Sequence, residues 1–208
     1  MKVPTLKQAT EFIKYAEEKN PGEWIAHSYN VAKAAKSIAR ECPDLDGDIA
    51  YVLGLLHDIG RYEGRVQMHH SVSGYDFLMC KGYDDAARIA LTHSFILPDI
   101  RGYAGQVDCT EAELTFIKDY IKSTIYNDYD KLIQLCDAIA LPEGICLMEK
   151  RLFDVVMRYG INDLTLIKWK TQLGLSDYFS KKIGKSIYKV LDGVIETTFG
   201  FNSIITDK

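Results

Sequence analysis

An apolar run that ends abruptly in a histidine and an aspartate constrains the fold of this chain more than any other feature. Residues 49–56 read Ile-Ala-Tyr-Val-Leu-Gly-Leu-Leu, without one charged side chain, and His57 and Asp58 follow directly. A helix that is apolar on every side must be surrounded by other elements, because none of its faces is suited to water. The run therefore predicts a buried central helix, from Ile49 to about His57, with a polar pair at its carboxyl end.

Helical periodicity extends over nearly the whole chain, so the sequence predicts an all-α fold. Apolar residues three and four positions apart define one face in most segments, and no segment predicts a strand beyond a local possibility. Asp46 or Asp48 is expected to cap the central helix, and Thr110 to open a capping box with Glu113. The expected helices are 5–18, 23–40, 49–57, 69–80, 84–92, 111–123, 128–140, 145–158, 163–173 and 176–198.

Length and composition limit the possible domain organisation and the possible partners. The chain has 208 residues, 47% of them hydrophobic, which suits one domain with a sizeable core. A net charge of −4 without a long basic run argues against nucleic acid as a partner. The longest apolar run is too short to cross a bilayer, and the first residues lack the apolar core of a signal peptide. The sequence indicates no oligomeric state.

The five cysteines are odd in number and scattered, and no two of them form a C-x-x-C pair. This pattern argues against both a disulfide framework and a thiolate zinc site. Small buried thiols in a reducing compartment are the simplest interpretation. We therefore expect a cytoplasmic protein.

Six histidine and aspartate residues are candidates for a metal site. His57 and Asp58 can turn toward one ion only at a helix end, because neighbours inside a helix point about 100° apart. His27 and Asp137 belong to two other predicted helices, and the four residues together would form a nitrogen and oxygen site for a divalent transition metal. His70 and His93, at a helix start and a helix end, could hold a second metal.

Two adjacent metals would define the chemistry of such a site. Metals about 3.5–4 Å apart occur in two-metal hydrolases, where they lower the pKa of a bound water to about 7. The resulting hydroxide can attack a phosphorus atom, while the metals neutralise charge on the phosphoryl oxygens. The residue types alone do not choose among Fe, Mn, Zn, Ni, Co and Mg, nor between one ion and two.

Each candidate also has a purely structural alternative. His57 and Asp58 could close the helix as a hydrogen-bonded pair, and Asp137 could cap a helix or pair with a cation. His93 would be a favourable cation at a helix carboxyl end. His69 is expected to be an ordinary hydrogen-bonded side chain. The joint placement of four of the five histidines favours the metal site.

The sequence resembles the HD superfamily of metal-dependent phosphohydrolases, whose pattern is a histidine, a His-Asp pair and a distant aspartate on a helical bundle. The matching segments are Ala26-His27-Ser28, Leu55-Leu56-His57-Asp58-Ile59-Gly60-Arg61 and Cys136-Asp137-Ala138-Ile139. The resemblance covers residues 20–142. It implies an HD-domain bundle, a single domain over residues 1–208, with additional C-terminal helices over residues 145–200.

A two-metal subset of that superfamily has two further histidines, and this chain is similar to it. His70-Ser-Val-Ser-Gly74 matches a His-x-x-x-Gly segment, and Ile89-Ala-Leu-Thr-His93 matches a short helix that ends in histidine. The resemblance is to the small bacterial proteins that include diadenosine-tetraphosphate hydrolases. Arg61 stands where these relatives often have lysine. Gly102-Tyr103 is followed by Ala104, which separates the chain from the cyclic-dinucleotide phosphodiesterases.

The resemblance and the residues together predict a metal-dependent phosphohydrolase that acts on a nucleotide or another small phosphate ester. Asp58 would be the shared ligand, and Arg61 would hold a substrate phosphate without binding metal, with Arg65 or Arg101 as substitutes. The segment 94–110 would form part of the pocket rim. A one-metal 5′-nucleotidase and a non-catalytic HD-fold sensor of nucleotide or metal remain alternatives.

Overall fold

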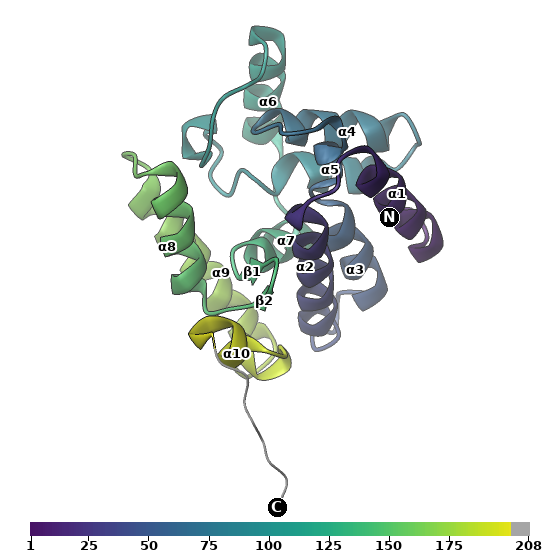
Figure 1. Ribbon diagram of the computed structural model, residues 1–208. Coiled ribbons are helices and arrows are strands. Elements are labelled where there is room, and N and C mark those ends of the chain that lie inside the picture. Colours follow the sequence, from purple (N-terminus) through teal and green to yellow (C-terminus); the bar gives the residue numbers. More distant parts are fainter. Residues whose placement is uncertain (201–208) are drawn as a thin grey trace, which may run out of the picture.

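The computed structural model describes residues 1–200 and consists almost entirely of helices (Figure 1), which confirms the predicted all-α fold. Within these residues, three short 3₁₀ turns and one two-stranded hairpin complete the fold. The α-helices are α1 (Leu6–Lys19), α2 (Glu23–Ala39), α3 (Gly47–Leu56), α4 (His69–Met79), α5 (Asp84–Thr92), α6 (Glu111–Ser123), α7 (Asp128–Asp137), α8 (Met148–Tyr159), α9 (Thr165–Lys182) and α10 (Val194–Phe199). The 3₁₀ turns are η1 (Ile59–Glu63), η2 (Ile100–Gly102) and η3 (Ile187–Val190).

Helix α3 is the centre of the bundle, as its apolar sequence predicts. It packs against α1, α2, α5 and α7, and Leu53, Leu55 and Leu56 are almost completely buried. Asp46 caps the helix by accepting hydrogen bonds from the backbone amides of Asp48 and Ile49. The apolar contacts on every side fix the position of the helix, and with it the position of its carboxyl end.

A buried polar network fixes α5 relative to α7. The Asp130 carboxylate of α7 is fully buried; Arg88 pairs with it, and the hydroxyl of Thr92 donates to it at 2.9 Å. The side chain of Gln134 donates to the backbone oxygen of Thr92 at 3.1 Å. A buried carboxylate needs such partners, because an unpaired charge inside a protein is strongly destabilising. The network lies one residue before His93 and therefore positions that histidine.

The predicted helix ends agree with the structure in most of the bundle. Thr5 and Gln8 form a capping box that opens α1, and Thr110 and Glu113 form the expected one that opens α6. The sequence predicts no helix between residues 57 and 69, and Gly60 and Gly64 indicate a loop there, but the structure contains the 3₁₀ turn η1 at Ile59–Glu63. Asn20 closes the turn by donating to the backbone oxygens of Arg61 and Gly64.

The C-terminal third departs most from the sequence prediction. Helix α7 ends at Asp137 rather than at residue 140, because the antiparallel strands β1 (Ala140–Leu141) and β2 (Gly144–Ile145) follow. The predicted break between residues 173 and 176 does not exist, since α9 continues through the exposed Gly174. The predicted helix 176–198 is instead divided by Gly184 and Gly193, which adopt positive φ of 69° and 72° that glycine tolerates best.

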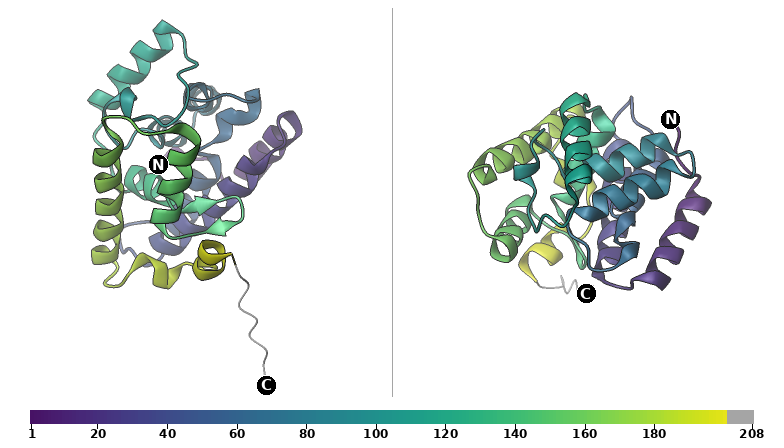
Figure 2. Two further views of the ribbon diagram at one scale, coloured as in Figure 1. Left: turned by 60° about the vertical axis from the view of Figure 1, so that its left-hand side comes forward. Right: turned by 90° about the horizontal axis from the view of Figure 1, so that it is seen from above.

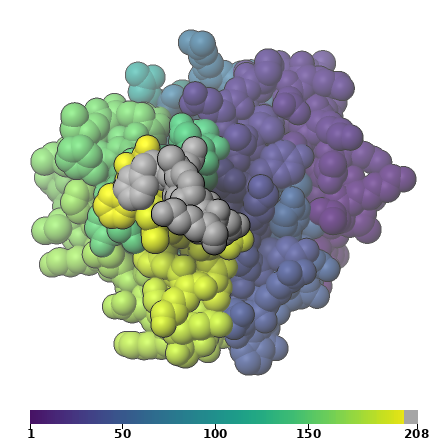
Figure 3. Space-filling view, turned by 60° about the horizontal axis from the view of Figure 1, so that its bottom comes forward, coloured from purple at the N-terminus to yellow at the C-terminus, as the bar shows by residue number. Residues whose placement is uncertain are grey.

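Helices α8 and α9 form a separate wall of the molecule. They lie on one side of α2, α3 and α7, with α1 on the opposite side (Figures 1 and 2). Figure 3 shows the yellow C-terminal part between the green α8–α9 region and the blue and purple N-terminal helices. In the part of the chain that the structure describes, no helix combines the length and apolarity that a membrane crossing requires.

The structure buries Cys42, Cys136 and Cys146, as expected for small interior thiols, whereas Cys80 is exposed and Cys109 is half-buried. The cytoplasmic location remains a prediction.

Candidate metal centre

His57 lies at the carboxyl end of α3, where its side chain is buried and one ring nitrogen has no hydrogen-bond partner. Its Nδ1 donates to the backbone oxygen of Gly54 at 2.7 Å, since a carbonyl oxygen can only accept. Nε2 of the neutral ring therefore carries a lone pair, and this buried atom has no hydrogen-bond partner. Burial lowers the pKa of His57 to about 3, so the ring is neutral at neutral pH and suited to bind a metal.

His70 and His93 have the same orientation. The Nδ1 of His70 donates to the backbone oxygen of Gln67, and that of His93 to Ala90 at 2.9 Å. Their Nε2 atoms face each other at 3.1 Å, and Ser94 Oγ lies 2.9 Å from that of His93. Backbone carbonyls thus set the tautomers of three histidines, which is how ligand rings are commonly held in metal sites.

Asp58 lies between the two sets of histidines. Its Oδ1 is 3.1 Å from Nε2 of His70 and 3.5 Å from Nε2 of His93, and its Oδ2 is 3.8 Å from Nε2 of His57. Ligand atoms of His27, His57 and Asp58 lie within 4.8 Å of one another, and so do those of Asp58, His70 and His93. One carboxylate therefore belongs to both groups.

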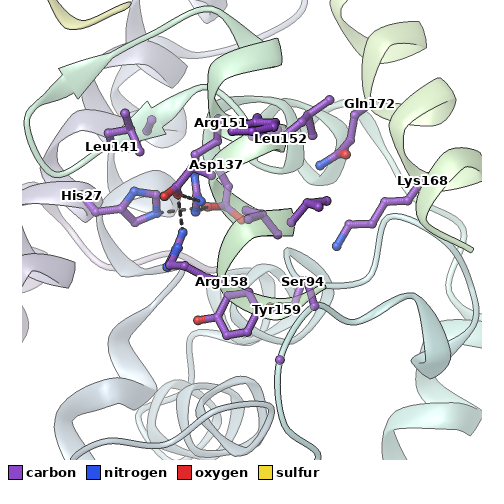
Figure 4. A pocket seen from close by; sticks show the side chains of 18 of the residues that line it. His27, Ser94, Asp137, Leu141, Arg151, Leu152, Arg158, Tyr159, Lys168 and Gln172 are labelled. Carbon is purple, nitrogen blue, oxygen red and sulfur yellow. Dashed lines mark hydrogen bonds and ion pairs between the residues drawn. The ribbon is translucent and has the colours of Figure 1, made fainter. Parts of the chain in front are cut away.

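Helices α2 and α7 supply the remaining pair. His27 Nε2 lies 3.0 Å from Asp137 Oδ1, and Figure 4 shows the two side chains next to each other in the pocket lining, joined by a dashed line. Burial alone would raise the pKa of Asp137, but His27 and His57 hold it well below its ordinary value. The carboxylate is therefore ionised at neutral pH. The six predicted ligands thus come together at one place, although they originate from α2, α7 and the ends of α3, α4 and α5.

Arg61 has a partner that the sequence did not identify. Its Nε donates to Asp58 Oδ2 at 2.7 Å, and the side chain also lines the pocket. Burial alone would raise the pKa of Asp58, but Arg61, followed by His57 and His70, keeps it well below its ordinary value. Arg61 therefore orients a candidate metal ligand, in addition to any contact with substrate.

His69 points away from these ligands. It lies between Glu63 and Glu113, with Nε2 3.1 Å from one carboxylate and Nδ1 3.3 Å from the other. With Cys109 and Glu113 it forms a separate, half-buried group of potential ligands. Of the two adjacent histidines, His70 is the one that joins the centre.

The donor set fits a divalent metal. Nε2 of His57 is a buried acceptor without a donor, and Nε2 of His70 and His93 converge with Asp58. A buried polar atom without a partner is destabilising, and a cation would satisfy all of these acceptors together. Imidazole and carboxylate ligands suit Mn, Fe, Co, Ni and Zn, so the residues do not single out one metal.

Five of the six residues border a large cavity of about 990 Å³, namely His27, Asp58, His70, His93 and Asp137. The side chain of His57 is buried and does not line it. Ser94, Gly102 and Tyr103 contribute to its lining, so the segment 94–110 forms part of the rim as predicted. Arg65 and Arg101, the predicted alternative cations, do not line the cavity. Arg151 of α8 and Lys168 of α9 do, and the sequence did not predict either of them. The sequence signal for Arg151 was its position in the predicted helix 145–158, which also contains the basic residue Arg158.

Histidines and aspartates from five helices of the bundle converge and form a candidate metal centre. The family model of the HD domain matches residues 24–140, more than half of the 208-residue chain. The chain therefore belongs to the HD domain family, whose members bind divalent metals. Comparisons with curated proteins and with solved structures gave no match.

Proposed function

We propose that this protein is a metal-dependent phosphohydrolase that cleaves a nucleotide or another small phosphate ester. The observation that carries the proposal is that Asp58 is common to two groups of candidate ligands beside the cavity. A pair of metals that share a carboxylate supports in-line displacement at phosphorus. Membership of the HD domain family supports the same reaction class.

The chain's own residues have distinct roles in this proposal. His27, His57, Asp58 and Asp137 would hold one metal, and His70 and His93 would hold a second together with Asp58. A bound divalent metal supplies an acidified water and charge neutralisation on the phosphate. Arg61 holds Asp58 through the 2.7 Å hydrogen bond from Nε, and its Nη1 donates to the backbone oxygen of Val66 at 3.3 Å. The other terminal nitrogen is offered to a phosphate oxygen.

The two-metal arrangement favours the subset that includes the diadenosine-tetraphosphate hydrolases. His70 and His93 support this assignment because their Nε2 atoms converge on Asp58 at 3.1 and 3.5 Å. A one-metal 5′-nucleotidase would instead use these two histidines for substrate. Elemental analysis separates the two possibilities, since the first requires two equivalents of metal.

The decisive experiment is a phosphate-release assay with a panel of nucleotides and generic phosphate esters on protein reconstituted with Mn²⁺ or another dication. We expect turnover of at least one member. Absence of turnover with every metal and substrate, from protein shown to contain metal, would favour the non-catalytic sensor and reject the proposal.

The matched control pair is Asp58→Ala and Asp119→Ala. Asp58 is the shared ligand, so its removal should abolish turnover and leave the helical content intact. Asp119 is exposed on α6 and its substitution should change neither. If Asp58→Ala kept more than about a tenth of wild-type kcat, which is about 1.4 kcal/mol in barrier height, the shared role would be wrong.

A further inference from the structure

The wall of the cavity opposite α2 is built from α8 and α9, which lie outside the HD-matching residues 24–140. This wall contributes Arg151, Arg158, Lys168 and Gln172 to the cavity lining (Figure 4). The wall also contains apolar side chains, and Asp154 pairs with both Arg151 and Arg158, so Lys168 is the cation of this group that no carboxylate among residues 1–200 neutralises. A cavity with ionised carboxylates at one end and cations on its wall is suited to a metal-bound anion between them.

Lys168 is a cation without a counter-ion. Its Nζ donates to the backbone oxygen of Gly102 at 3.1 Å, and no carboxylate in residues 1–200 forms an ion pair with it. Burial lowers its pKa, and the charge of Arg151 lowers it further against the opposing effect of Asp137. Figure 4 shows the ammonium group extending from α9 toward the interior of the pocket. An uncompensated ammonium at this position would gain from an anionic ligand.

Arg151 connects this cation with the metal centre. Its guanidinium lies 4.0 Å from Asp137 Oδ1 and donates to Asp154 at 3.1 Å. Its Nε is buried and has no hydrogen-bond partner. Unsatisfied buried polar atoms are rare in folded proteins, and this one is an N–H donor of a cation that lines the cavity.

We propose that Arg151 and Lys168 form a second phosphate subsite next to the metal centre, and that the substrate carries at least two phosphate groups. The proposal rests on the proposed function, because one phosphate group is assigned to the metals. The next phosphate group in the chain would lie against Arg151 and Lys168. A nucleoside polyphosphate or another compound with a phosphate chain has the required chemistry, whereas a simple monoester would leave the subsite empty.

A structural role for Lys168 is the competing explanation. Its bond to Gly102 fastens the segment 94–110 to α9, and Asn162 donates to the neighbouring Arg101 backbone oxygen at 2.9 Å. If fastening were its only role, replacing Lys168 would affect all ligands of the cavity alike. A phosphate contact would affect only ligands that are long enough to reach it.

The test compares two inert probes by calorimetric titration of the full chain at a constant concentration of free Mn²⁺. The probes are orthophosphate and the bis(methylene) analogue of inorganic triphosphate, in which carbon replaces both bridging oxygens. Lys168→Met should weaken binding of the triphosphate analogue by about tenfold or more and that of orthophosphate by less than about twofold, because one charge-assisted contact is lost. Lys168→Arg should retain most of the affinity.

Lys170→Met is the matched control, since Lys170 is exposed on the same helix and does not line the cavity. It should change neither affinity, and thermal melting should show that all variants fold. Equal weakening of both probes, or no weakening of the triphosphate analogue, would overturn the subsite. Because neither probe turns over, a Lys168-dependent preference combined with an inactive protein would reject only the proposed function.

Discussion

Two adjacent histidines have opposite environments, and they offer the sharpest test at the scale of single residues. Nε2 of His70 faces Asp58 and His93, whereas His69 lies between two glutamates. His70→Ala should therefore reduce bound metal from two equivalents toward one. His69→Ala should leave the amount of metal bound at the six-residue centre unchanged. Elemental analysis of both purified variants checks this, and metal loss in His69→Ala alone would reverse the assignment.

Arg61 is a second residue whose role follows from its geometry. Arg61→Ala should lower kcat/KM. The loss should correspond to about 1.5–3 kcal/mol of transition-state stabilisation, which is the contribution of a hydrogen bond to a charged group. The substitution should also weaken metal binding by about 10–100-fold, because partners that orient a ligand have effects of that size. This second effect revises the sequence prediction that metal binding would be unaffected.

Arg61→Lys is the control, because an ammonium keeps the charge but not the planar fork of the guanidinium. It should recover only part of both losses. Steady-state kinetics and metal titration of the two variants provide the measurements. Unchanged kcat/KM in Arg61→Ala would remove Arg61 from the substrate site.

At the scale of elements, the contact between η1 and α4 depends on glycine. A Cβ on Gly60 would overlap the backbone oxygen of His70 and the backbone nitrogen of Gly74. The backbone cannot yield as a flexible side chain would, so Gly60→Ala should destabilise the fold by about 1–3 kcal/mol or more. Because η1 and α4 carry Arg61 and His70, metal affinity should fall as well.

Gly174→Ala is the matched control, since Gly174 lies in α9 and a Cβ added there would have no neighbouring atom within 4 Å. It should stabilise the protein by about 0.4–1 kcal/mol. Urea denaturation of both variants gives the two free energies of unfolding. A Gly60→Ala variant as stable as the wild type would contradict the close approach.

The same elements explain what the sequence can predict. The candidate metal ligands lie at or near helix termini, and periodicity and capping residues locate those termini. Arg151 and Lys168 escaped prediction because their position depends on how α8 and α9 pack against the core, which involves residues far apart in the chain. The predicted break between residues 173 and 176 contains Gly174, but a single glycine weakens a helix by only about 1 kcal/mol, which packing can offset.

For the whole molecule, bound metal should act as a cross-link between separate helices. A ligand that binds only the folded state stabilises it by about 3–4 kcal/mol at 100–1,000 times its Kd. In a domain of this size each kcal/mol corresponds to about 2–4 °C in melting temperature. Removing metal with a chelator should therefore lower the Tm measurably and abolish turnover.

Asp58→Ala serves as the control for the melting experiment, since the chelator should have little effect on a variant that has lost the shared ligand. Differential scanning calorimetry with and without chelator provides the comparison. Identical midpoints for wild-type protein that is known to contain metal would contradict a cross-linking role.

If both candidate positions bind metal, the position of Asp58 between the two ligand groups would link their occupancies thermodynamically. An ion held by His27 and His57 would withdraw charge from the carboxylate and restrict its rotation, and both effects would alter the affinity of Asp58 for an ion held by His70 and His93. If the first ion changes the affinity for the second by some factor, the second ion changes the affinity for the first by the same factor. A metal titration of this protein would then yield stepwise constants that belong to the pair, and substituting a ligand of one position would change the apparent affinity of the other.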